Sequence, residues 1–353
     1  MPENLLVIRL SALGDLVLAL PSLHHLRRRH PEAHLAIVVR DRYRTLFAED
    51  PVIDEVISVA RGEEPEVAGS LRARGWDLVL DLQGTLRSRR LAAGIRARER
   101  RCVKRDRLAR WGLLLRARLG ASGPGRPVPH VVRRFLEAAG AGGDEFAPPL
   151  RLSLFETTRE RSGDWLRARG MMPGRLLAIL PGASHPVKAW TPEGFAEVAR
   201  TAETHWGLQP LVLGGEEDRD VVGRVARLLG RPSEIWCANG DLPFLAALLE
   251  RCRAAVANDS GVSHLAAAVG TPVVGVFGPT VAEFGFHPWG DNTRIHSKSM
   301  TCRPCSLHGS RSCRIGTHRC MREISPADVV SSVSQALEVS SRRPLLRDIM
   351  GMR

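Results

Sequence analysis

The sequence predicts an α/β protein with two doubly wound domains of similar size, and three observations support this fold class. Short apolar runs alternate with helical patterns in both halves of the chain. Such alternation is typical of parallel sheets that carry helices on both faces. The chain has 353 residues, which is more than one ordinary domain needs. A segment rich in glycine and proline, residues 140–149, lies where a linker between two domains is expected.

The expected elements follow from these runs in order. The first half predicts strands at residues 5–10, 35–39, 55–59 and 78–82. One long helix is expected over residues 16–30, because Pro31 cannot continue it. The second half predicts strands at residues 176–180, 210–213, 233–237, 254–257 and 273–277. We therefore expect one domain over residues 1–150, a second over 151–325, and ligands in the cleft between them.

The last helix has a clear start signal. Ser325 is a typical N-cap residue, Pro326 suits the first helical position, and Asp328 places an acid in the first turn. Apolar residues then recur at helical spacing. Residues 326–353 are expected to form this helix and a basic tail.

Composition narrows the class of protein and its partners. The chain is 44% hydrophobic and 25% charged, an ordinary globular balance, and its formal charge is +13. This excess favours anionic partners such as nucleic acid, acidic lipid or phosphorylated sugars. Arg9 and Asp15 interrupt the apolar N-terminal run, which favours a buried strand over a signal peptide. No apolar run is long enough for a membrane span, and the scattered Cys102, Cys237 and Cys252 fit a reducing cytosol.

The most specific motif runs from Asn258 to His264 and includes Asp259, Ser260 and Gly261. Apolar runs flank it, so it predicts a strand, a tight polar turn and the start of a helix. Free backbone N–H groups and the helix dipole at such a start favour an anion. The motif therefore predicts a phosphate or diphosphate site and a nucleotide-linked substrate.

Two further loops follow strands in the same half. The first carries Ser184 and Lys188, which offer a hydroxyl and a point charge to a diphosphate. The second carries Glu216, and a carboxylate at this position can accept both hydroxyls of a ribose. Each loop alone also fits a plainer interpretation, a solvated surface loop for the first and an acid-rich helix start for the second.

The first strand of the chain leads into Arg9, Ser11, Gly14 and Asp15. Gly14 permits a tight turn and the close approach of a ligand. A carboxylate at Asp15, facing the expected cleft, is a candidate general base for a sugar hydroxyl. On spacing alone, a helix cap is the commoner role for such a residue.

Four cysteines near the C-terminus are candidate ligands of a structural zinc ion. They are Cys302, Cys305, Cys313 and Cys320. Their number suits a zinc site with four thiolate ligands, although only the first two form a C-x-x-C pair. Inert or oxidisable thiols in a surface loop are the alternative. A catalytic metal is not expected.

Residues 87–118 form a strongly basic stretch that contains thirteen Lys or Arg and only two acids, with Trp111 and a leucine run embedded in it. A charge run is commonly just a solvated face. Basic segments with tryptophan and leucine also suit an anionic membrane surface, which we favour here.

Taken together, these motifs resemble glycosyltransferase family 9, the heptosyltransferases that transfer heptose from ADP-heptose to the inner core of lipopolysaccharide. The motifs that carry the resemblance are Arg9-x-Ser11-x-x-Gly14-Asp15, the 182–190 loop, Gly214-Gly215-Glu216, Asp259-Ser260-Gly261-x-x-His264 and Phe277-Gly278-Pro279-Thr280. The resemblance runs from the first strand to about residue 330. It implies the GT-B fold, in which two Rossmann-like domains face each other across a cleft.

The resemblance also implies roles for the matching residues. Asp15 matches the general base in an acceptor-binding N-terminal domain, with Ser11 and Gly14 on the acceptor side. Lys188 matches a contact that assists the leaving diphosphate. The remaining donor-site matches are Ser184, Glu216, Asp259, Ser260, Gly261 and His264. The implied reaction inverts the anomeric carbon and needs no metal cofactor, because Lys188 and a helix N-terminus can neutralise the diphosphate.

The implied partners are ADP-heptose, the lipopolysaccharide core and the anionic inner-membrane surface, which makes the enzyme cytoplasmic and peripheral. A relative with another nucleotide-sugar or acceptor is the alternative within this family. An inactive, sugar-binding relative is less favoured, because the motif residues are present. A nucleic-acid-binding protein is disfavoured too, since the chain has one Tyr and lacks an aromatic-rich basic platform for stacking bases.

Overall fold

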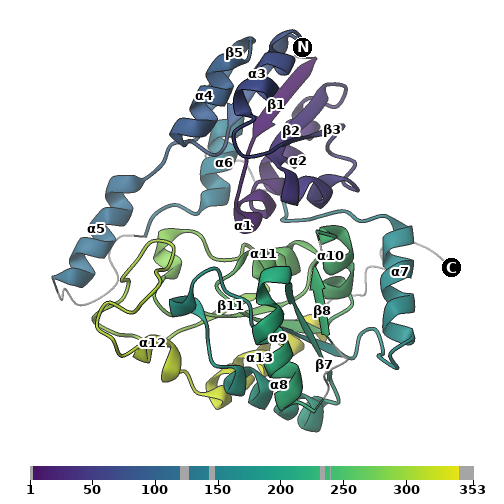
Figure 1. Ribbon diagram of the computed structural model, residues 1–353, viewed down its shortest axis with the longest axis vertical. Coiled ribbons are helices and arrows are strands. Elements are labelled where there is room, and N and C mark those ends of the chain that lie inside the picture. Colours follow the sequence, from purple (N-terminus) through teal and green to yellow (C-terminus); the bar gives the residue numbers. More distant parts are fainter. Residues whose placement is uncertain (1–2, 120–126, 143–147, 231–234, 239, 342–353) are drawn as a thin grey trace.

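The computed structural model describes residues 3–119, 127–142, 148–230, 235–238 and 240–341, and these form two lobes (Figure 1). We call residues 3–142 the N-terminal lobe and residues 148–341 the C-terminal lobe. Each is built on its own parallel sheet. The linker expected at 140–149 and the basic tail lie partly outside the described residues.

The N-terminal lobe contains a five-stranded sheet with the order β3-β2-β1-β4-β5. Its strands are β1 (Asn4–Ile8), β2 (His34–Arg40), β3 (Glu55–Val59), β4 (Trp76–Asp81) and β5 (Ala97–Cys102). Leu5 in the central strand β1 pairs with Leu35 on one side and Leu78 on the other. Because these central strands are buried on both faces, they are almost continuously apolar.

The C-terminal lobe contains a six-stranded parallel sheet with the order β11-β10-β9-β6-β7-β8. Its strands are β6 (Leu176–Leu180), β7 (Gln209–Gly215), β8 (Ile235–Ala238), β9 (Ala254–Asn258), β10 (Val273–Val276) and β11 (Thr293–His296). The order reverses direction beside β6 and β9. The loops that follow these two strands therefore lie next to each other, at the place where such sheets bind ligands.

Helices cover both faces of both sheets. In the N-terminal lobe they are α1 (Leu13–Val17), α2 (Leu20–Arg29), α3 (Glu64–Arg72), α4 (Leu86–Gly94), α5 (Arg107–Arg118) and α6 (Val131–Ala139). In the C-terminal lobe they are α7 (Glu156–Arg167), α8 (Pro192–Trp206), α9 (Arg219–Leu228), α10 (Leu242–Glu250), α11 (Gly261–Ala268), α12 (Arg319–Arg322) and α13 (Pro326–Ser341). Short 3-10 turns are η1 (Asp41–Phe47), η2 (Pro186–Lys188), η3 (Glu216–Asp218) and η4 (Ala282–Phe284). Among the described residues, no helix has the length and apolarity needed to cross a membrane.

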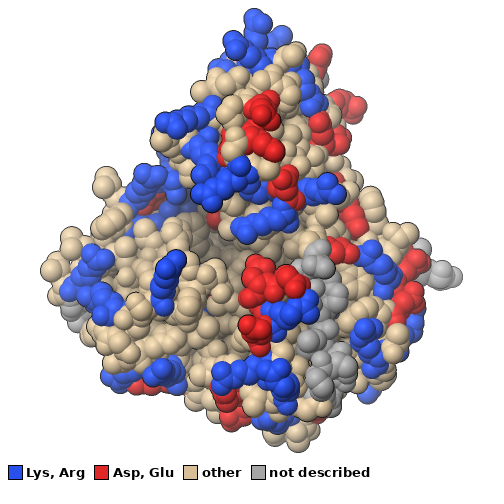
Figure 2. All heavy atoms as spheres, in the orientation of Figure 1, with Lys and Arg blue, Asp and Glu red and all other residues tan. Residues whose placement is uncertain are grey.

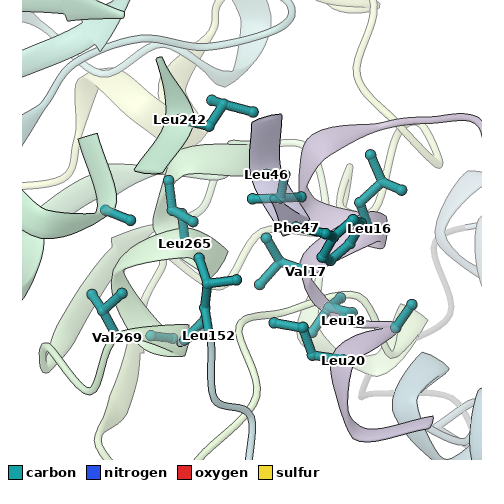
Figure 3. Packing of buried hydrophobic residues seen from close by; sticks show 14 of the residues in the cluster. Leu16, Val17, Leu18, Leu20, Leu46, Phe47, Leu152, Leu242, Leu265 and Val269 are labelled. Carbon is teal, nitrogen blue, oxygen red and sulfur yellow. The ribbon is translucent and has the colours of Figure 1, made fainter. Parts of the chain in front are cut away.

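The largest apolar cluster is shared by the two lobes (Figure 3). Val17 and Phe47 of the N-terminal lobe belong to it, and so do Leu152, Leu265 and Val269 of the C-terminal lobe. All five are at most 8% exposed. Since the cluster continues from one lobe into the other, apolar packing fixes how the lobes face each other.

The expected helix over residues 16–30 is wrong, because two helices occupy this segment. The first, α1, ends at Val17, and α2 begins at Leu20 with Pro21 in its first turn. Proline lacks the N–H that a continuous helix would require at this position. In contrast, the start signal of the last helix is confirmed: the Ser325 hydroxyl accepts a hydrogen bond from the Asp328 N–H at 3.2 Å.

Two strands were not anticipated. One of them, β5, lies inside the basic stretch, where Arg and Glu side chains leave no apolar alternation to recognise. It forms the edge of its sheet, and charged side chains are typical of edge strands. The other, β11, forms an edge of the second sheet.

Candidate active site

The two lobes meet most closely where α1 approaches α11. A Cβ on Gly14 would lie 2.6 Å from Cδ2 of His264. A Cβ on Gly261 would lie 2.8 Å from the Cβ of Leu13. Both glycines are therefore required by the close approach of the two helices. This contact brings the first motif of the chain against the Asp-Ser-Gly turn.

Asp15 lies on α1, and its side chain is 27% exposed. Arg9 forms an ion pair with it. The Arg9 guanidinium also donates to the Leu82 carbonyl at 2.6 Å, and it lies over the Phe135 ring at 5.4 Å. Arg9 thus holds the Asp15 carboxylate in a fixed position while one side of it stays open.

Lys188 and Asp259 form an ion pair on the opposite side of the cleft. Lys188 Nζ lies 2.7 Å from Asp259 Oδ2, and both side chains are largely buried. The Thr280 hydroxyl donates to the same carboxylate oxygen at 2.7 Å. Asn258, which is fully buried, accepts from the Trp190 N–H at 3.0 Å and donates to the Pro181 carbonyl at 2.8 Å. These bonds join the loops after β6, β9 and β10 into one site.

His264 lies between these two groups and is only 5% exposed. Burial lowers the pKa of His264 to about 4. The carboxylates of Asp259 and Asp15 act in the opposite direction and raise this pKa, whereas the positive charge of Lys188 lowers it further. The imidazole is therefore neutral at neutral pH. Within the described part of the chain, its Nδ1 has no hydrogen-bond partner. That atom is therefore a buried nitrogen with unmet hydrogen-bonding capacity.

The other predicted donor-site residues are placed around this centre. Ser260 is the N-cap residue of α11, and Gly261 is its first residue. Ser184 is exposed in the loop after β6. Glu216 is exposed on η3 and forms an ion pair with Arg219 at 2.7 Å, which lowers the pKa of the Glu216 carboxyl.

Asp218 is a residue that the sequence analysis missed. It accepts from the Gly215 N–H at 3.0 Å. A Cβ on Gly182 would lie 2.2 Å from its Oδ2, so its carboxylate reaches the loop after β6. Asp218 thus connects the loop that carries Ser184 with the loop that carries Glu216. No sequence signal separates it from its acidic neighbours.

The cysteine segment packs against the loop that carries Lys188. The His318 ring lies 2.7 Å from the Val187 carbonyl, and Gly309 contacts His185 closely. Burial and the nearby thiols raise the pKa of Cys305 and Cys320. In the described ranges, however, no group of three or more His, Cys, Asp or Glu side chains is gathered as a metal site requires. The thiols of Cys302, Cys305 and Cys313 nevertheless act on the pKa of Cys320, so the four side chains lie near one another, and a structural zinc ion there stays a prediction.

Two hollows open beside Asp15. The smaller, of about 440 Å³, is lined by Asp15 together with residues of α5, α6 and the C-terminal lobe. The larger, of about 930 Å³, lies between α3 and α4. Ser11 and Gln83 line both. Gln83 accepts from the N–H groups of Leu10 and Ser11 at 3.0 and 3.2 Å, which holds this junction in place. Figure 2 shows the recess between the lobes, with Lys and Arg side chains along its upper rim.

A family model decides the identity of this arrangement. The model of glycosyltransferase family 9 (heptosyltransferase) matches residues 66–314, which is more than half of the chain. The chain belongs to glycosyltransferase family 9. It is a transferase, as the resemblance implied.

Individual members of family 9 are similar over most of their length. Lipopolysaccharide heptosyltransferase 1 of Pseudomonas aeruginosa is 29% identical over 318 residues, which make up 86% of each chain. Lipopolysaccharide heptosyltransferase 2 of Escherichia coli K12 is 26% identical over 303 residues, 80% of this chain and 84% of its own. The solved structure of the E. coli ADP-heptose LPS heptosyltransferase II matches with a TM-score of 0.74 and 21% identity, over 96% of this chain and 99% of that one. This match identifies the two-lobed fold of the family 9 chain as GT-B.

Proposed function

We propose that this enzyme transfers heptose from ADP-heptose to the inner core of lipopolysaccharide with inversion at the anomeric carbon. The observation that carries the proposal is the contact of α1 with α11. This contact brings the motif that contains Asp15 against the turn whose Asp259 pairs with Lys188, which supports a shared active site. The named relatives, all heptosyltransferases, support the choice of sugar.

Asp15 is proposed as the general base. It accepts the proton of the acceptor hydroxyl as that oxygen attacks the anomeric carbon. Arg9 keeps the carboxylate oriented toward the cleft. The hydroxyl approaches from the N-terminal lobe, which fits an inverting, single displacement.

The donor site is proposed at the loops after β6, β7 and β9. Lys188 and the backbone N–H groups at Ser260 and Gly261 stabilise the charge that develops on the leaving diphosphate. Asp259 positions Lys188 through their ion pair. Ser184 supplies a further hydroxyl contact. Glu216 accepts hydrogen bonds from the ribose hydroxyls, which take the place of its surface partner Arg219. We propose that these residues suffice without a metal cofactor.

The larger hollow is proposed to hold the rest of the acceptor. It continues from Ser11, next to Asp15, toward α3 and α4, and Arg72, Arg87 and Arg90 line it. Several arginines suit an acceptor that carries acidic sugars and phosphates. An acceptor larger than one sugar would need such a continuous groove.

We also propose that α5 docks on the anionic surface of the inner membrane at its cytoplasmic face. Leu108, Trp111, Leu115 and Leu119 are between 56% and 89% exposed and recur at helical spacing. The opposite face of α5 packs on the protein through Leu113 and Leu114. Exposed arginines flank the apolar stripe, as in helices that lie in a membrane interface.

The deciding experiment for the proposed function is a transfer assay with the full-length protein. ADP-heptose and a lipopolysaccharide inner-core acceptor should give a heptosylated product and ADP. Parallel reactions with other nucleotide-sugars, and with the acceptor replaced by a neutral oligosaccharide, test the alternative within the family. A faster reaction with another donor would replace heptose in the proposal.

A further inference from the structure

Two buried arginines beside Asp15 form no hydrogen bond with an acidic side chain. Arg110 of α5 is 6% exposed and Arg134 of α6 is 5% exposed. Among the residues that the structure describes, Arg110 Nη2 and Arg134 Nε and Nη2 are buried and have no hydrogen-bond partner. Arg110 Nε donates to the Phe284 carbonyl at 3.2 Å. Arg134 Nη1 donates to the Lys104 carbonyl at 3.4 Å. Three of the six guanidinium nitrogens of this pair are thus buried without a partner among the described residues.

Burying the positive charges of these two side chains is energetically unfavourable. Burial and the neighbouring Arg134 lower the pKa of Arg110 to about 10, and burial lowers the pKa of Arg134. Both remain protonated at neutral pH. The nearest carboxylate is that of Asp106, 3.5 Å from Arg134 Nε. The Asp15 carboxylate also acts on both arginines, but it is already paired with Arg9. The two buried cations therefore carry positive charge in excess of these anions, which proteins rarely bury without a use for it.

Both arginines line the hollow of about 440 Å³ that also contains Asp15. The Phe286 ring of the C-terminal lobe holds them in place, with its centre 4.1 Å from the Arg110 guanidinium carbon and 5.8 Å from that of Arg134. Arg105 and Arg107 line the same hollow. Since Arg9 lines it too, the hollow brings the general-base candidate together with five arginines.

We propose that Arg110 and Arg134 form a subsite for an oxyanion of the acceptor, either a phosphate monoester or a carboxylate, within reach of the hydroxyl that Asp15 deprotonates. Taking the ligand to be the acceptor rests on the proposed function. Planar guanidinium groups bind such oxyanions through paired N–H donors. The acid group supplies the hydrogen bonds that the buried N–H groups lack and aligns the neighbouring hydroxyl with Asp15.

The first test measures anion binding without any transfer reaction. The full-length protein is saturated with ADP, so that the donor site is filled, and is then heated with inorganic phosphate or with acetate. We expect phosphate, acetate or both to raise the melting temperature of the wild type. The Arg110→Met variant should lose this rise, whereas Arg133→Met, which removes an exposed arginine of the same helix as Arg134, should keep it.

The anion-free samples separate binding from a structural role. Because an uncompensated charge is removed, Arg110→Met without anion should melt at or above the wild-type temperature. A response to phosphate alone identifies a phosphate monoester, and a response to acetate as well identifies a carboxylate. If Arg110→Met does not fold, Arg134→Lys is the alternative variant. It keeps the positive charge, removes the paired N–H donors of the guanidinium group and should weaken the response to the anion.

The second test is kinetic. Arg110→Met should raise the KM for the acceptor about 10-fold or more and leave the KM for the donor unchanged, as expected for the loss of charge-assisted hydrogen bonds. Equal anion responses in wild type and Arg110→Met, or no response of the wild type to either anion, would overturn the subsite. Anion binding without heptose transfer would retain the subsite and reject the proposed reaction.

Discussion

Gly14 and His264 face each other across the lobe interface so closely that a single added carbon on Gly14 would lie 2.6 Å from the imidazole. The first motif of the chain and the donor-site turn are therefore in direct contact. Any side chain at Gly14 must displace His264 or separate the lobes. This relationship makes the catalytic arrangement sensitive to a one-carbon change.

We expect Gly14→Ala to lower turnover strongly, because Asp15 moves away from the donor site when α1 shifts. A misplacement of about 1 Å can cost about 100-fold in rate. Steady-state assays of transfer measure the effect. The control is Gly112→Ala on α5, where an added Cβ meets nothing within 4 Å. That variant should keep its turnover and gain up to about 1 kcal/mol of stability. Normal turnover in Gly14→Ala would show that the contact is not needed.

Asp15→Asn should fold normally and lose about 10²–10⁴-fold in turnover, the range for a lost general base. The amide keeps the shape of the carboxylate but cannot accept the proton. Turnover is compared with that of Asp41→Asn, which changes an exposed carboxylate on η1. A wild-type rate in Asp15→Asn would remove Asp15 from the mechanism.

Lys188→Ala should weaken ADP binding about 10- to 100-fold, since a charge-assisted hydrogen bond contributes about 1.5–3 kcal/mol. The unpaired Asp259 would also repel the diphosphate. Calorimetric titration with ADP measures the affinity. The matched control is Lys298→Ala, because Lys298 also pairs with an aspartate, Asp328, at 3.2 Å. Unchanged ADP affinity in Lys188→Ala would place the diphosphate elsewhere.

Stability should fall as the pH drops below about 6.5. Burial lowers the pKa of His130 to about 3 and that of His264 to about 4. Each of these two groups takes up a proton near pH 6.5 in the unfolded chain but not in the native state, so together they lower the free energy of unfolding by about 2.7 kcal/mol per pH unit. Burial also lowers the pKa of His30, His287, His296 and His308, which adds to this loss. Urea unfolding between about pH 6.5 and 5, above the range of most carboxylates, measures this slope.

His130→Asn should reduce that slope by about 1.4 kcal/mol per pH unit, because one of these groups is gone. The exposed His205 provides the control, and His205→Asn should leave the slope as it is. The His130 ring accepts from the Val132 N–H at 3.2 Å and lies 2.8 Å from the His287 carbonyl. An unchanged slope in His130→Asn would mean that its ring is protonated in the native state.

Replacing Leu108, Leu115 and Leu119 together by serine should lower binding to anionic vesicles at least about 10-fold, since each buried apolar side chain contributes about 1.5–3 kcal/mol. Vesicle co-sedimentation with and without acidic lipid measures the loss. Transfer to a detergent-dispersed acceptor should stay normal. The exposed apolar residues Phe155 and Met172 lie away from α5, and their serine variants should bind vesicles like the wild type. Equal binding by the triple variant would exclude α5 as the docking helix.

Most of the strands and the donor-site turn could be predicted because their signals are local. Apolar runs mark β1, β6 and β9, and Asp259 to His264 follows directly from the sequence order of strand, turn and helix. The break before Pro21 was readable in principle, since proline at this position always interrupts the hydrogen-bond ladder.

The features of the fold and the site that could not be predicted depend on contacts between distant residues, which no local sequence pattern indicates. Arg110 and Arg134 are 24 residues apart, on two helices, and only the fold makes them neighbours of Asp15. Thr280 reaches Asp259 from another loop. The edge strand β5 forms because β4 offers it backbone partners, although its own side chains carry no strand signal.

The apolar cluster that both lobes share has a consequence for how such enzymes can change over evolutionary time (Figure 3). Val17 and Leu265 belong to different lobes, and both are fully buried in this shared cluster. Neither half can therefore be replaced by the corresponding half of a relative unless the facing surface fits it. The two lobes must be inherited as a matched pair, even though each contains a complete sheet.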